Sequence, residues 1–142
     1  MDVNGVGRGA METFEKDIWS KIIKIAEEKK ETGEPFRTID RGNKNWVIKI
    51  MPSGISVQSE KNYMGKPNGK PRNVSKEALK EAWELLKKNG KMNREDMSLW
   101  FSDDNKIIRT GAIIRGILSC LPNISIEEIK GIKTLVYKET DC

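Results

Sequence analysis

The sequence contains no histidine, and this absence restricts the chemistry open to the chain. Serine and cysteine nucleophiles that need a histidine base are excluded within it, and so are zinc sites with histidine ligands. The two cysteines, Cys120 and Cys142, have no metal-binding spacing and do not make a disulfide framework. We therefore predict a non-enzymatic protein without metal or cofactor, in which Cys120 is a small filler of the core.

Long apolar runs are also missing. No run approaches the roughly 20 residues that span a bilayer, and residues 1–12 lack the apolar segment of a signal peptide. These absences favour a cytoplasmic protein without a membrane partner. Four Trp residues spread along the chain indicate folded structure, with a disordered start at residues 1–11 and a tail at 139–142.

Residues 12–60 are predicted to form a small α+β module. Apolar residues recur at helical spacing from Glu12 to Lys30, and Gly33 and Pro35 end the helix. The period then changes to two, and Gly-containing turns separate three short predicted strands. We expect one helix packed on an antiparallel meander, formed by residues 36–39, 46–51 and 55–59. Trp46 in this module could stack on a base, although a place in the core is the commoner role for such a residue.

Positive charge is concentrated in residues 61–76. This segment carries five Lys or Arg and no acid, which equals the formal net charge of +5 for the whole chain. Its Gly, Pro and Asn residues disfavour regular structure, so residues 61–74 are predicted to form an exposed basic loop or linker. Such a strip is typical of a polyanion-binding surface, although a solvated linker has the same composition. The candidate phosphate contacts here are Lys66, Lys70, Arg72 and Lys76.

Residues 75–138 are predicted to form a second, mainly helical half. Ser75 caps a first helix that ends at Asn89-Gly90, Asn93 caps a second, and a third runs over residues 109–121. The segments around 124–126 and 132–137 have two interpretations. They form a β-hairpin, which we favour, or Ser125 and Glu128 form a capping box that opens one helical turn before a single strand.

Three short helices followed by a hairpin, with Gly90-Lys-Met-Asn-Arg-Glu-Asp96 leading into the second helix, resemble the winged helix-turn-helix family over residues 75–138. A fainter likeness is to DNA-binding modules of prokaryotic restriction and mobile-element proteins. The resemblance implies that the second and third helices form the helix-turn-helix and that the hairpin is the wing. The implied partner is nucleic acid, with double-stranded DNA favoured.

The third helix offers a test of this interpretation. A helical wheel of residues 109–121 places aliphatic side chains on one face and donors with small residues on the other. Arginines on that outer face could contact phosphates or guanine edges, and Gly116 would let the backbone approach a groove. The nucleic-acid contacts predicted on this helix are Arg109, Thr110, Arg115 and Ser119.

Two alternatives remain open. A degenerate winged helix can serve as a protein-interaction or dimerisation module, with a homodimer or a larger protein assembly as the partner. A metal-dependent nuclease fragment is the enzymatic alternative, because Asp103, Asp104, Glu128 and Lys130 imitate the acids and lysine of restriction-type nucleases. The predicted fold class is α+β in each case, and the sequence leaves open whether the two halves share one core.

Overall fold

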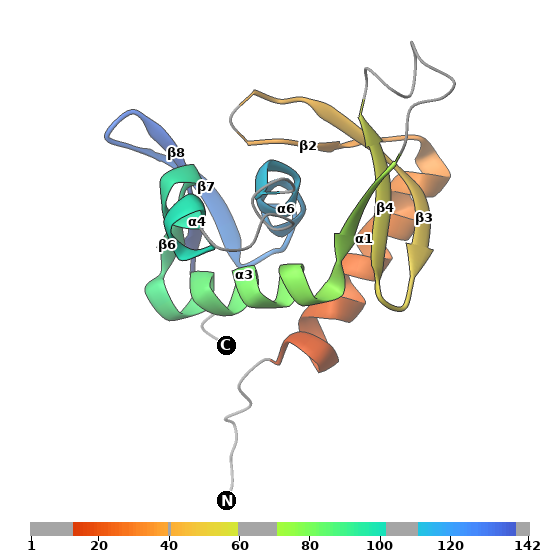
Figure 1. Cartoon of the computed structure of the whole chain (residues 1–142), viewed down its shortest axis with the longest axis horizontal. Helices are drawn as coiled ribbons and strands as arrows, with labels where there is room; N and C mark the ends of the chain where they lie inside the picture. Colours follow the sequence, from red (N-terminus) through yellow and green to blue (C-terminus); the bar gives the residue numbers. More distant parts are fainter. Residues whose placement is uncertain (1–12, 40, 60–70, 102–110, 139–142) are drawn as a thin grey trace, which may run out of the picture.

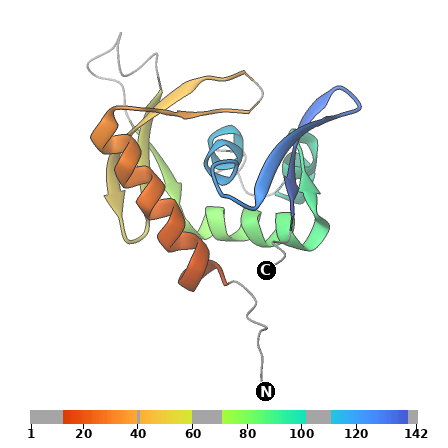
Figure 2. The same ribbon diagram turned by 180° about the vertical axis from the view of Figure 1, so that it is seen from behind.

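The computed structural model describes residues 13–39, 41–59, 71–101 and 111–138, and its architecture is α+β as predicted. Two antiparallel sheets stand on either side of a central helix, and a long helix runs beneath all three (Figures 1 and 2). Strand order is β2-β3-β4-β5 in the first sheet and β6-β8-β7 in the second. The predicted disordered start and the predicted tail lie outside the described residues.

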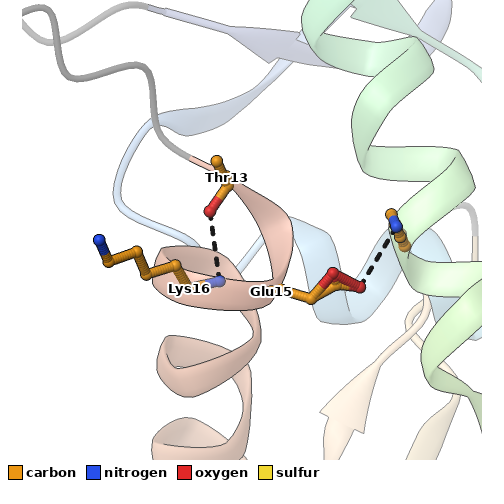
Figure 3. A network of polar contacts seen from close by, with 4 residues as sticks. Thr13, Glu15 and Lys16 are labelled. Atoms are coloured by element: carbon orange, nitrogen blue, oxygen red, sulfur yellow. Dashed lines mark hydrogen bonds and ion pairs between the residues drawn. The ribbon is translucent and has the colours of Figure 1, made fainter.

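The chain enters its first helix through a short π-helical turn. This turn, η1 (Phe14–Ile18), continues directly into α1 (Trp19–Thr32). The hydroxyl oxygen of Thr13 accepts a hydrogen bond of 3.3 Å from the backbone N–H of Lys16, which satisfies one of the free donors at the start (Figure 3). Gly33 adopts a left-handed conformation with φ 78° and ends the helix where the sequence predicts.

The first sheet contains the predicted meander and one further strand. Its strands are β2 (Phe36–Arg37), β3 (Lys44–Met51), β4 (Gly54–Ser59) and β5 (Arg72–Ser75). The assignment of Arg72 to the loop 61–74 is wrong, because Arg72 pairs with Val57 at the edge of the sheet. The reason lies in β4, whose backbone is buried and needs partners on both sides, and Val74 of β5 completes its apolar face with no exposed surface.

The second half contains three helices in the described residues and a small sheet. Ser75 and Asn93 cap the first two helices as predicted, and Asn93 forms a reciprocal capping box with Asp96. The final segment is the favoured hairpin, with Lys130 (φ 53°) and Gly131 (φ 79°) at its turn, so the capping-box interpretation of that segment is wrong. The elements are α3 (Lys76–Asn89), β6 (Lys91–Met92), α4 (Arg94–Trp100), α6 (Gly111–Leu118), β7 (Ile124–Ile129) and β8 (Ile132–Tyr137).

The two halves share one core. Buried apolar residues from both halves form a single cluster among the described residues. A chain of aromatic rings crosses it, with Phe14 and Trp83 at a centroid distance of 6.1 Å and Trp83 and Tyr137 at 6.4 Å. At the surface, Lys80 Nζ of α3 lies 3.2 Å from Glu15 Oε1 of η1, the contact drawn in Figure 3. The halves are therefore fixed against each other.

Candidate nucleic-acid interface

The predicted recognition face of α6 is covered by the N-terminal half. The β2–β3 hairpin extends over α6 in both views (Figures 1 and 2). Arg115 is only 5% exposed, and a Cβ atom at Gly116 would collide with the carbonyl oxygen of Arg37 in β2. The prediction that Arg115 is exposed for base contact is therefore wrong. Small residues on that face do permit close backbone approach, but the approaching backbone is β2.

The other predicted contacts are scattered or lie outside the described residues. Arg72 is exposed on the edge strand β5. Lys76 is half-buried, with its ammonium 5.7 Å from the ring centroid of Trp19. Ser119 is half-buried, and its hydroxyl donates a hydrogen bond of 2.7 Å to the carbonyl of Gly116. The predicted contacts outside the described residues are Lys66, Lys70, Arg109 and Thr110.

An open groove of about 1060 Å³ lies beside the C-terminal end of α6. One wall comes from the end of α1 and the β2–β3 hairpin, and the other comes from the β7–β8 hairpin. The described residues that line it include five cations and two carboxylates, so its lining has an excess of three positive charges. The cations are Lys29, Arg37, Arg41, Lys44 and Lys133, and the acids are Glu34 and Glu128.

The cations differ in how firmly they are held. Lys29 is half-buried: its ammonium donates to the carbonyl of Pro35 at 3.4 Å and lies 5.3 Å from the ring centroid of Phe36. Arg37, Arg41 and Lys133 are exposed. A polyanion in the groove could therefore reach three solvated side chains on two walls, in addition to the fixed charge of Lys29.

The lining of the groove also includes the large apolar side chains Trp46 and Ile126. Trp46 is half-buried, and its indole N–H donates a hydrogen bond of 3.0 Å to the carbonyl of Gly33, which ties the ring to the end of α1. Ile126 of β7 is 50% exposed, so its aliphatic side chain offers apolar surface to a ligand in the groove. Trp46 thus lines a groove and is not a core residue.

Cys120 also lines the groove and is exposed, so the prediction that it fills the core is wrong. Its Sγ lies 3.5 Å from the carbonyl oxygen of Gly116. Desolvation raises the pKa of the thiol, and the charge of Lys29 and a hydrogen bond with Ser119 offset this only in part. A raised pKa lowers the thiolate fraction at neutral pH, which is the opposite of what a cysteine nucleophile requires.

Of the residues of the nuclease alternative, the structure describes Glu128 and Lys130, and these two are not placed as that chemistry requires. Glu128 lies on β7, but Lys130 occupies the hairpin turn in a left-handed conformation, so the two do not share one strand face. Asp103 and Asp104 lie outside the described residues. Within the part of the chain that is described, no three acidic or cysteine side chains gather closely enough to hold a metal ion.

Comparison with known proteins adds no relative: no family model, curated protein or solved structure matches the chain. None of the helices in the described ranges is long and apolar enough to cross a membrane. The function of the groove is therefore inferred from its charge, shape and lining.

Proposed function

We propose that this protein is a non-enzymatic nucleic-acid-binding module and that the basic groove is its phosphate-binding surface. The observation that carries the proposal is the gathering of five cations around one groove, against two carboxylates among the described residues of its lining. Outside residues 61–76, the chain has 21 basic and 21 acidic residues, because 26 − 5 leaves 21 and the segment holds no acid. The excess at the groove is thus a local feature of the fold, and a phosphate backbone is the polyanion it suits.

The proposal includes a winged-helix arrangement for residues 75–138. It is supported by the order of elements, with helices α3, α4 and α6 followed by the β7–β8 hairpin. In that arrangement the hairpin is the wing, and Lys133 is a wing residue that faces the nucleic acid. Because β2 covers the outer face of α6, nucleic acid does not bind to that face. It binds instead in the groove between the wing and the β2–β3 hairpin.

A charge-matched pair of variants tests this proposal. The groove variant replaces the exposed cations Arg37, Arg41 and Lys133 with Ala. The control variant replaces Lys24, Lys88 and Lys91, which are also exposed and do not line the groove. Each variant loses three charges, so an effect of net charge alone is the same in both.

Binding is measured by fluorescence anisotropy with labelled oligonucleotides between 50 and 200 mM salt. We expect the groove variant to bind at least about tenfold more weakly than wild type. Its plot of log K against log salt should also be less steep, by the amount that corresponds to the loss of up to about three phosphate contacts. The control should stay within about threefold of wild type. Equal losses in the two variants would contradict binding at the groove. No binding of any oligonucleotide by wild type at 50 mM salt would leave a protein-interaction module as the better account.

A further inference from the structure

The geometry around α6 bears on which form of nucleic acid the groove accepts. A helix reads duplex DNA by entering the major groove, which is about 12 Å wide, and this requires an exposed helix face. Here Arg115 is only 5% exposed, and Gly116 of the same face packs against the backbone of β2 so closely that no space is left even for a methyl group. This face of α6 is therefore not available to enter a major groove.

The groove itself has the size and lining of a site for unpaired bases. Its volume of about 1060 Å³ is slightly above the roughly 300–1,000 Å³ typical of small-ligand pockets. That space suits a few nucleotides, whereas a duplex keeps its base faces stacked inside. Trp46 and Ile126 lie among the cations of the lining, and aromatic surface combined with positive charge is what sequence-tolerant binding of single strands uses.

We propose that the groove binds single-stranded nucleic acid in preference to duplex. Arg37, Arg41 and Lys133 contact phosphates on the two walls, and a base packs against Trp46 and Ile126. This inference rests on the proposed function and adds the form of the ligand to it. Single-stranded DNA and RNA share the required chemistry, so the experiment includes both.

The first test uses wild-type protein and so does not depend on the folding of a variant. A 12-nucleotide single-stranded DNA, the RNA of the same sequence and the corresponding duplex DNA compete for the protein at 150 mM salt. We expect at least one single strand to bind about tenfold or more tightly than the duplex. Equal or tighter binding of the duplex, with the groove variant still impaired, would overturn the single-strand inference and leave the proposed function standing. Absence of binding by all three would overturn both.

The second test asks whether a base contacts the apolar residues of the groove. Trp46→Leu removes the aromatic surface and should reduce single-strand affinity by about tenfold, whereas Trp46→Phe keeps a ring and should stay within about threefold of wild type. If Trp46→Leu does not fold, as judged by circular dichroism, Ile126→Ala replaces it, because Ile126 is half exposed and its removal leaves the core intact. Ile126→Ala should lose at least about threefold. Wild-type affinity in every folded variant would overturn the base contact.

Discussion

Gly116→Ala is the substitution on which the arrangement of the two halves depends most directly. A Cβ atom at this position meets the carbonyl oxygen of Arg37, a backbone atom that cannot rotate away as a side chain can. Overpacking of this kind typically costs about 1–3 kcal/mol, and the rigid partner favours the upper end of that range. Alanine returns about 1 kcal/mol through its better helix propensity. We therefore expect a net destabilisation of about 2 kcal/mol, or about 6–8 °C in melting temperature for a chain of this length.

Gly111→Ala in the same helix is the matched control. A Cβ atom there would lie 3.5 Å from the sulfur of Met97, which is an ordinary contact with a flexible side chain. The substitution carries the gain in helix propensity without the collision, so stability should be unchanged or should rise by up to about 1 kcal/mol. The two variants are compared by thermal and urea unfolding followed by circular dichroism. A Gly116→Ala protein as stable as the Gly111→Ala protein would refute the packing of β2 on α6.

Three further predictions concern single residues. Arg115→Ala should lower the free energy of unfolding by about 2–4 kcal/mol, because the side chain is only 5% exposed and its truncation leaves a cavity. A urea melt with wild-type stability would contradict this. Asn93→Ala removes the side-chain oxygen that accepts from Asp96 N–H at 2.8 Å, so thermal unfolding should show a loss of about 1 kcal/mol. In a Cys142→Ser background, Cys120 should react more slowly with iodoacetamide at pH 7 than the same thiol in urea, because its raised pKa lowers the thiolate fraction. The difference should shrink as the pH rises through that raised pKa, and equal rates at pH 7 would contradict the desolvation of the thiol.

Local features of the fold were predictable because a few neighbouring residues determine them. The end of α1 at Gly33 and the caps at Ser75 and Asn93 each depend on one side chain or one backbone conformation. The hairpin at the C-terminal end follows from two β-rich segments around a short turn that contains Gly131. Signals of this kind are complete within five or six residues of sequence.

What covers each surface was not predictable in the same way. The helical wheel of α6 places Ile113 and Ile117 on the apolar face, and both are buried, but it does not predict that Arg115 and Gly116 of the other face are buried as well. The strand β5 was missed because Val74 is its single buried side chain, and one apolar residue does not produce the alternation of apolar and polar residues that indicates a strand. Its formation also depends on pairing with the edge of β4, which is distant information for a sequence pattern.

The groove was missed for a further reason. Lys29, Arg37 and Lys133 come from α1, β2 and β8, so about a hundred residues separate the first from the last. No short motif joins them. The positive charge of residues 61–76 can be recognised in the sequence because it is contiguous. The cations of the groove are brought close to one another only when the two halves pack together.

The central claim, that nucleic acid occupies the basic groove, is tested most directly by amide NMR of the ¹⁵N-labelled protein. A short single-stranded oligonucleotide is titrated at 50 mM salt, and the shifts are mapped on the structure. We predict that the largest changes fall on residues of both walls and of the end of α6, namely Arg37, Lys44, Ser119, Ile126 and Lys133, together with the indole N–H of Trp46. Changes confined to surfaces away from these residues, or no changes at saturating oligonucleotide, would contradict the claim.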